Sequence, residues 1–160
     1  MGNLNAIGID SSKAKDLAEK LNELLSNYSI FYQNTRGYHW NIKGEKFFEL
    51  HVKFEELYND LFLKIDEVAE RILTLGHTPY HNYSDYRKTS KIGESEQISD
   101  GLKAVEGILN SFQIIIILQR ELLELSADAL DEGTNALMGD YIRAQEKLVW
   151  MYSSFMNNQQ

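Results

Sequence analysis

The chain has 160 residues, of which 16 are basic and 24 acidic, giving a formal charge of −8. Its length suits one domain over residues 1–160, and 43% hydrophobic residues suffice for a packed core. The acidic balance disfavours a nucleic-acid-binding surface, and the absence of cysteine excludes disulfides and thiolate metal sites. Residues 1–10 lack the basic and apolar runs of a leader peptide, and the longest aliphatic run, 114–118, is too short to span a bilayer. We therefore expect a cytoplasmic protein outside the membrane.

Two long helices are predicted in the first half of the chain. Asp10 offers an N-cap, and apolar residues recur with a helical period over residues 17–32. A short turn is expected at residues 41–45. A second apolar period covers residues 50–72, and Gly76 suits the position that directly follows a helix.

Two more helices are predicted in the second half. Residues 77–94 contain the single proline and three tyrosines, and predict a long connection with a short helical turn inside it. Apolar periods then indicate helices over residues 98–129 and 137–152, separated by a short break at 131–134. The short links make the first and last helix pairs antiparallel, whereas the long link can cross the bundle and make helices two and three parallel. The prediction is an all-α, ferritin-like four-helix bundle with one long crossover connection between helices two and three.

A polar stripe on the predicted second helix is arranged symmetrically in sequence. Its members are spaced by three or four residues, so they lie along one face of the helix. They are His51, Glu55, Asn59, Phe62, Asp66 and Glu70. Taken from the two ends inward, these residues form three pairs: 51 with 70, 55 with 66, and 59 with 62. All three pairs share one midpoint, between residues 60 and 61.

This symmetry predicts a metal site that is shared between two chains. At about 1.5 Å rise per residue, His51 and Asp66 lie about 22 Å apart along the helix, too far to bind one ion. If a second copy of the helix runs antiparallel across the first at the shared midpoint, His51 faces Glu70 of that copy, and Glu55 faces its Asp66. A two-fold dimer would then hold two identical sites.

The residue types in the stripe suit iron. Fe(II) accepts imidazole nitrogen and carboxylate oxygen, and His39, at the end of the first helix, could fold in beside His51. Taken singly, a helical glutamate is usually a solvated charge, so the argument rests on the symmetric set. Single-chain di-iron bundles use Glu-x-x-His pairs. None of the four histidines here has an acid three residues before it, which favours the shared site.

The stretch from Tyr38 to Gly76 resembles the Dps family, the DNA-binding proteins from starved cells, or mini-ferritins. The resemblance rests on an HW pair, a second histidine twelve residues after the first, and the segment DEVAERI, and it extends over nearly the whole chain. It implies a hollow dodecamer that oxidises Fe(II), with hydrogen peroxide rather than dioxygen, and stores ferric oxide. Such a ferroxidase protects the cell and its DNA from oxidative damage. The alternative is a non-catalytic DNA-protecting nucleoid shell.

Carried over to this sequence, the resemblance implies five iron ligands at each two-fold interface. They are His39, His51 and Glu55 from one subunit, and Asp66 and Glu70 from its mate. Many members of the family have aspartate where this chain has Glu55, and we expect the longer side chain to change the occupancy of the second iron position.

The resemblance implies two further roles that compete with simpler interpretations. Trp40 would intercept radicals beside the iron site, or only pack at the end of a helix. Asp131 and Asp140 match acidic residues of the three-fold pores that admit iron, but Asp131 could equally be a helix cap. Ala136 stands where many members have another acid.

Three other side chains are assigned structural places. Trp150 is expected in the core or at an interface. His77 and His81 flank Pro79, which breaks a helical pair, so both histidines are interpreted as loop residues.

Direct DNA binding is expected to be weak or absent. Members of the family that bind DNA commonly use a tail rich in lysine and arginine, whereas residues 1–12 contain neither and residues 156–160 carry no charge. Lys13, Lys15 and Lys20 are expected within the first helix, beside acidic residues. Twelve copies would together carry a charge of about −96, which repels a phosphate backbone.

Overall fold

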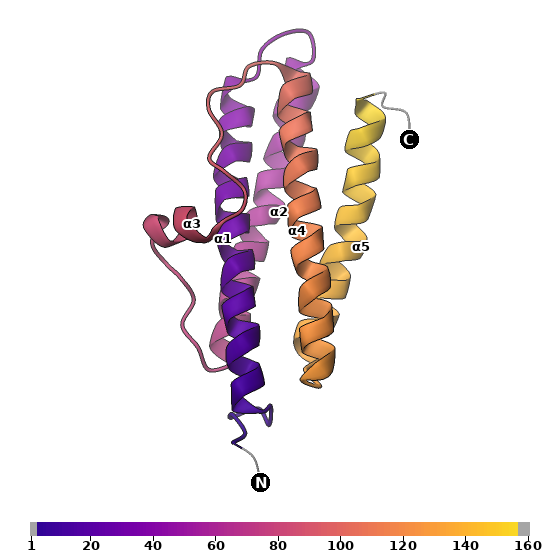
Figure 1. Ribbon diagram of the computed structural model, residues 1–160. Helices are drawn as coiled ribbons and strands as arrows, with labels where there is room; N and C mark the ends of the chain where they lie inside the picture. Colours follow the sequence, from indigo (N-terminus) through magenta and orange to yellow (C-terminus); the bar gives the residue numbers. More distant parts are fainter. Residues whose placement is uncertain (1–2, 157–160) are drawn as a thin grey trace.

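The computed structural model describes residues 3–156 and contains four long helices and one short helix (Figure 1). The helices are α1 (Ser11–Asn41), α2 (Phe47–Thr74), α3 (Tyr83–Thr89), α4 (Gly101–Asp128) and α5 (Glu132–Phe155). The only β-type pairing among the described residues is one isolated bridge between Leu4 and Asp10. The prediction of an all-α fold is confirmed.

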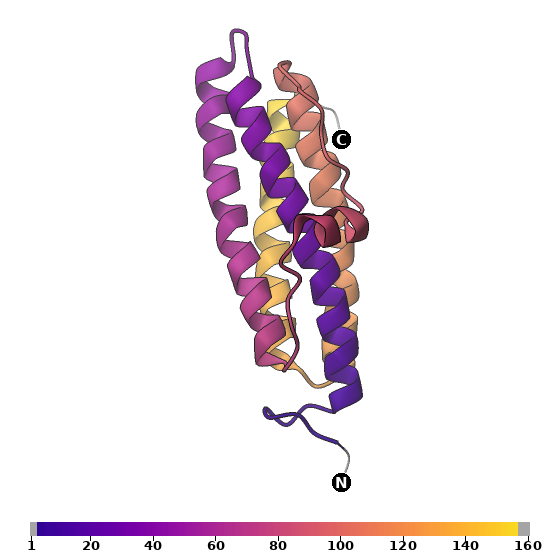
Figure 2. The ribbon, with the colours of Figure 1, turned by 90° about the vertical axis from the view of Figure 1, so that its left-hand side faces the viewer.

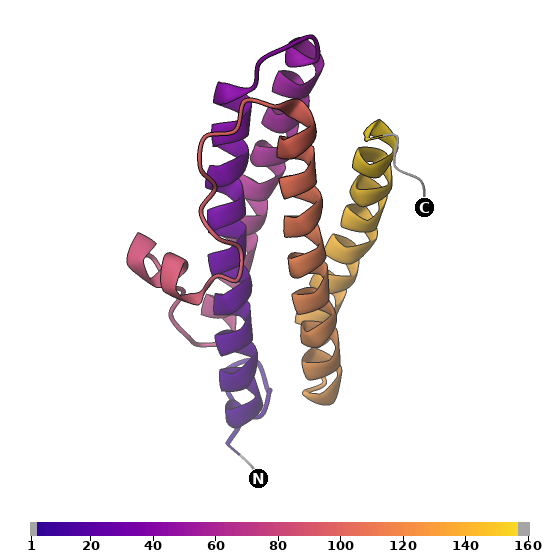
Figure 3. The same ribbon diagram turned by 45° about the horizontal axis from the view of Figure 1, so that its top comes forward.

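The directions of the long helices follow the lengths of their connections. Helices α1 and α2 are antiparallel, α2 and α4 are parallel, and α4 and α5 are antiparallel (Figures 1 and 2). The connection between α2 and α4 returns along the outside of α1 and carries α3 against it (Figure 3). This is the predicted ferritin-like four-helix bundle with one long crossover.

The expected signals at helix ends are present. The Asp10 carboxylate accepts hydrogen bonds from two backbone N–H groups in the first turn of α1, each at 3.0 Å. After α2, Gly76 has a φ of +90°, its N–H donates to the carbonyl of Leu73, and the next N–H donates to the carbonyl of Ile72. This is a Schellman motif, which needs a left-handed residue and therefore suits glycine.

Helix α4 is the most apolar part of the bundle. By length and composition alone it is the one described helix that could cross a membrane. In the structure it is a core helix, because Ile108, Phe112 and Leu122 are fully buried. Phe112 also packs edge-on against Phe31 of α1, with ring centroids 5.1 Å apart.

A closed ring of three polar side chains lies in the centre of the bundle. The Tyr28 hydroxyl donates to Gln119, the Gln119 amide donates to Gln145 at 2.7 Å, and the Gln145 amide donates back to the Tyr28 oxygen at 2.7 Å. All three side chains are buried, and burial raises the pKa of Tyr28 far above its usual value, so the ring is neutral. In single-chain di-iron bundles, glutamates and histidines project into this central region.

Candidate metal centre

His39 and His51 lie against each other where α1 ends and α2 begins. Their rings are stacked, with centroids 3.7 Å apart and planes inclined by 14°. The expectation that His39 folds in beside His51 is confirmed. Two aromatic residues of α2 support the pair, because Phe47 stacks on His51 at 4.8 Å and Tyr58 packs edge-on against His39 at 5.3 Å.

Each histidine of this pair forms a hydrogen bond with the backbone of the other. His39 Nδ1 lies 2.6 Å from the carbonyl oxygen of His51, and His51 Nδ1 lies 2.8 Å from the carbonyl oxygen of His39. A carbonyl oxygen can only accept, so each Nδ1 carries a hydrogen and donates it. In a neutral imidazole the lone pair is then on Nε2, the nitrogen left free to bind a metal.

Glu55 lies one helical turn after His51 and brings a carboxylate to the same place. Its Oε1 atom is 4.0 Å from Nε2 of His39, and its side chain is half exposed. One chain therefore brings together two oriented imidazoles and one carboxylate, three of the five residues predicted to bind iron.

Asp66 and Glu70 lie farther along α2, and both are exposed. At about 1.5 Å rise per residue they are more than about 20 Å from His51, as expected from their spacing. Between residues 3 and 156, no group of three or more histidine or acidic residues is placed so that one chain alone could hold a metal ion. The six residues of the stripe all belong to α2, where His51 is half-buried and the other five are exposed.

Exposed apolar side chains of α2 follow the symmetry of the stripe. Phe48 and Leu73 are 82% and 57% exposed, and the pair has the same midpoint, between residues 60 and 61. Leu63 is 63% exposed, whereas Tyr58, its counterpart about that midpoint, is half-buried. An antiparallel second copy would thus cover apolar as well as polar residues. This symmetry was available in the sequence, but it becomes informative only once the exposed positions are known.

Trp40, next to His39, lies at the surface with 56% of its area exposed. Its ring packs on the guanidinium of Arg36, which lies 4.8 Å from the ring centroid and 5.4 Å from that of Tyr32. This contact is a cation–π interaction. Packing at the helix end thus describes part of what Trp40 does, and its role towards radicals stays a prediction.

Asp131 is a buried helix cap, as the simpler interpretation predicted. It is only 2% exposed, its Oδ1 accepts the backbone N–H of Thr134 at 3.0 Å, and Arg71 of α2 donates to the same oxygen at 2.6 Å. These contacts account for Asp131 as a cap within one chain, and its place in a pore stays a prediction. The other candidate, Asp140, is exposed and lies 3.2 Å from Arg143, and its place in a pore stays a prediction.

Two remaining assignments have different outcomes. Trp150 is 63% exposed, so its placement in the core is wrong, and a place at an interface stays a prediction. His77 and His81 both lie in the connection between α2 and α3, and their interpretation as loop residues is confirmed.

A four-helix bundle with one long crossover and convergent histidine and carboxylate side chains has the features of the ferritin-like class. Comparison with known proteins agrees, because a family model described as a ferritin-like domain matches residues 18–160. A crystal structure of the Dps protein from Vibrio cholerae O1 matches with a TM-score of 0.95 and 54% identity, covering 96% of each chain. That protein is described as a member of a broad superfamily of ferritin-like diiron-carboxylate proteins.

Two curated relatives align along nearly their whole length. An uncharacterised protein of Haemophilus influenzae is 52% identical over 149 residues, covering 93% of each chain. The DNA protection during starvation protein of Porphyromonas gingivalis is 38% identical over 152 residues, covering 95% of this chain and 96% of the relative. The chain therefore belongs to the ferritin-like family and, within it, to the Dps proteins.

Proposed function

We propose that this protein is an iron-storage ferroxidase of the cytoplasm. It oxidises Fe(II) with hydrogen peroxide at sites shared between two subunits, and it stores the ferric oxide inside a hollow dodecamer. Each site takes His39, His51 and Glu55 from one subunit, and Asp66 and Glu70 from the mate. By removing both Fe(II) and peroxide, the protein limits oxidative damage to the cell and its DNA.

The observation that carries this proposal is the reciprocal hydrogen bonding of the two histidines. Both Nδ1 atoms donate to carbonyl oxygens at 2.6 and 2.8 Å, so both Nε2 lone pairs are available for a cation. Two histidines that only packed against each other, without binding a metal, would not both need their hydrogen on Nδ1. Glu55 beside Nε2 of His39 supplies the anionic oxygen that a divalent cation requires.

The proposed reaction pairs electrons. Two Fe(II) ions each give up one electron, and one peroxide molecule accepts both and, with two protons, becomes two water molecules. No hydroxyl radical is released, because the one-electron reduction of peroxide is avoided. The carboxylates of Glu55, Asp66 and Glu70 offset the charge that the iron gains, and the neutral imidazoles hold the ions in place. Fe(III) then moves inward and is hydrolysed to oxide.

Protection of DNA is proposed to work through iron rather than through direct binding. Lys13, Lys15 and Lys20 all lie in α1, as expected, and each has an acidic partner within 4.0 Å. The terminal segments weighed for DNA binding extend into residues 1–2 and 157–160, which lie outside the described residues. A gel shift at low protein concentration that weakened as salt increased would contradict this part of the proposal.

The proposal is tested by loading the purified protein with Fe(II) without oxygen and then adding peroxide. We expect fast formation of soluble ferric iron with little hydroxyl radical. Substituting His51→Ala should abolish fast oxidation while the assembly persists. His81→Ala, at an exposed loop histidine, is the matched control and should behave as the unmodified protein.

Either of two results would contradict the proposal. Iron that precipitates at the rate seen without protein would mean that the shared site does not oxidise it. Loss of assembly in His51→Ala would mean that the histidine holds the subunits together rather than binding iron.

A further inference from the structure

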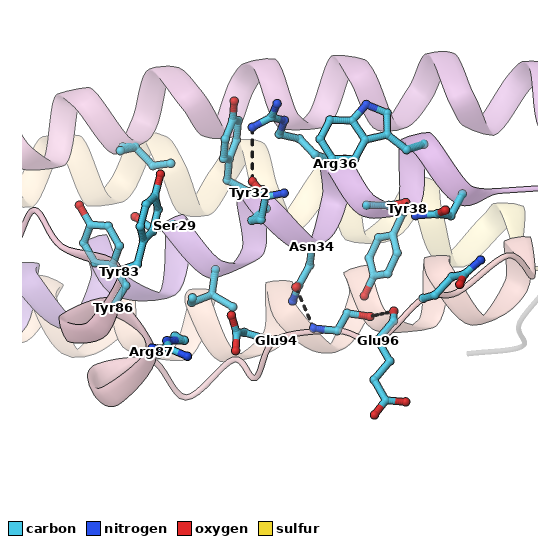
Figure 4. Close-up of a pocket in the computed structure, with 18 of the residues that line it drawn as sticks. Ser29, Tyr32, Asn34, Arg36, Tyr38, Tyr83, Tyr86, Arg87, Glu94 and Glu96 are labelled. Atoms are coloured by element: carbon cyan, nitrogen blue, oxygen red, sulfur yellow. Dashed lines mark hydrogen bonds between the residues drawn. The ribbon is translucent and has the colours of Figure 1, made fainter.

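A trough of about 690 Å³ runs along α1 (Figure 4). Its floor is α1, one wall is α2, and the other wall is the crossover with α3. Aromatic and charged side chains line it: Tyr32, Arg36 and Trp40 from α1, Phe62 from α2, and Tyr86 and Glu94 from the crossover. Phe62 also belongs to the stripe, so the trough is continuous with the face that the shared site needs.

Arg36 is a held but incompletely paired cation in this trough. Its guanidinium is fixed between the rings of Tyr32 and Trp40, and its one polar contact is a 3.3 Å hydrogen bond to Gln33. Of the four other arginines, those at positions 71, 120 and 143 each lie 2.6–3.2 Å from a carboxylate, whereas Arg87, on the crossover wall of the trough, has no ion pair among the described residues. Over residues 3–156, no carboxylate oxygen lies within 4.0 Å of the Arg36 guanidinium.

The register of the helices shows what a second copy would bring to Arg36. Tyr32 packs against Tyr58, and His39 against His51, so Arg36 is level with Phe54 on its own α2. The counterpart of Phe54 about the midpoint of the stripe is residue 67. Asp66 precedes residue 67 by one position. Measured along the helix axis, Arg36 and Asp66 of the second copy would therefore be offset by only about 1.5 Å.

The side-chain directions favour Asp66 over its neighbour Glu67. The Glu67 carboxylate accepts a hydrogen bond of 2.8 Å from Tyr141 of α5, so it is turned towards its own bundle. Asp66 is part of the exposed stripe, and the hydrogen bonds and ion pairs of the described residues give its carboxylate no partner within one chain. A free guanidinium and a free carboxylate thus lie at one level, on surfaces that two-fold pairing would bring together.

From this, and resting on the proposed two-fold iron site, we infer that Arg36 pairs with Asp66 of the second copy and positions that ligand before iron binds. Before iron binds, three carboxylates meet in each site, and their mutual repulsion opposes pairing of the subunits. A guanidinium offers a planar pair of donors that fits a carboxylate and offsets one of these charges. Incoming metal then takes over the role of counter-charge.

The inference is tested on the iron-free assembly by sedimentation at a concentration of urea, which is uncharged and does not screen ion pairs, that half-dissociates the unmodified protein. We expect Arg36→Gln to raise the apparent dissociation constant roughly tenfold, and Arg36→Lys to recover most of the loss because it retains the charge. Adding Zn²⁺, a redox-inert cation that accepts the same ligands, should promote assembly of both Arg36→Gln and the unmodified protein and shrink the tenfold difference between them, because the bound cation replaces Arg36 as counter-charge. If Arg36 only packs against its neighbours, the tenfold difference should persist in Zn²⁺.

A double-mutant cycle identifies the partner. Arg36→Gln combined with Asp66→Asn should weaken assembly no more than the stronger single substitution does, because both remove one interaction. Glu94→Gln, on the opposite wall of the trough, is the matched control and should leave assembly unchanged. Additive effects of the first pair, or a Glu94→Gln variant that behaves like Arg36→Gln, would overturn the inference.

The double-mutant cycle tests the pairing of Arg36 with Asp66, and the iron-oxidation assay tests the proposed function, so either claim can fail alone. Coupling between Arg36 and Asp66 in a protein that fails to oxidise iron would support the pairing and reject the ferroxidase. Fast iron oxidation without that coupling would support the ferroxidase and reject the pairing.

Discussion

Polar side chains gather both in the centre of the bundle and at the junction of α1 and α2, with opposite results. In the centre, Tyr28, Gln119 and Gln145 satisfy one another in a closed ring of neutral groups. At the junction, His39 and His51 satisfy only their Nδ1 atoms and leave both Nε2 atoms free. A complete hydrogen-bond network stabilises the fold, whereas an incomplete one at the surface offers donor atoms to a ligand.

The comparison explains how a ferritin-like bundle can carry metal donors away from its interior. The usual di-iron position between the helices projects glutamates and histidines inward. Here neutral amides and a phenol occupy the centre, and their hydrogen bonds to one another leave no anion for a cation to bind. The histidines and carboxylates instead lie at one end of α1 and along the exposed face of α2, where a second subunit can complete the set.

The largest loss of stability should come from opening a buried, satisfied cluster at the end of α2. Asp131→Ala removes the cap of α5 and leaves the Arg71 guanidinium, only 19% exposed, without its carboxylate. We expect a loss of about 3 kcal/mol or more per subunit, with little change in the rate of iron uptake. Thermal unfolding and ferric absorbance measure the two effects.

Asp140→Ala is the natural control for that substitution. Its ion pair with Arg143 is exposed, with 68% and 78% of the two side chains accessible, so stability should change by about 0.5 kcal/mol at most. If Asp131→Ala instead left stability intact and slowed iron entry, the pore assignment would be right and the buried cap irrelevant.

Opening the polar ring should have a smaller effect. Gln119→Leu leaves the Gln145 carbonyl without a donor and the Tyr28 O–H without an acceptor in a fully buried place. The expected cost is about 1–3 kcal/mol, with iron oxidation unchanged, because the ring holds no ligand. Gln113→Leu, at an exposed position of the same helix, is the control. Loss of iron oxidation at unchanged stability would show that the centre takes part in the chemistry.

A small gain in stability is expected at Leu130, which follows the end of α4 in the same way that Gly76 follows the end of α2. Leu130 has a φ of +57° and makes the same two backbone hydrogen bonds, but it is a non-glycine residue in a left-handed conformation. Its side chain is 84% exposed, so Leu130→Gly should stabilise the subunit by about 0.5–1 kcal/mol. Weaker assembly of this variant would mean that the leucine contacts another subunit.

Much of this architecture follows from sequence patterns because helical periods and link lengths report on local structure and topology. The stripe of α2, the cap at Asp10 and the turn at Gly76 were all predictable from spacing. The hydrogen bonds of the histidine pair were not, because they depend on where backbone carbonyls lie once α1 and α2 pack. The burial of Asp131 was equally hidden, because its partner Arg71 lies sixty positions earlier and reaches it only in the folded bundle.

The central claim, that each iron site takes residues from two subunits, is tested most directly by mixing two inactive variants. His51→Ala and Asp66→Ala subunits are each expected to lack fast iron oxidation. When they are co-assembled in equal amounts, half of the two-fold pairs are mixed, and each mixed pair keeps one intact site out of two. The account predicts recovery of about one quarter of the unmodified rate of ferric formation. No recovery in verified mixed assemblies would contradict it, because sites built within one chain cannot complement each other.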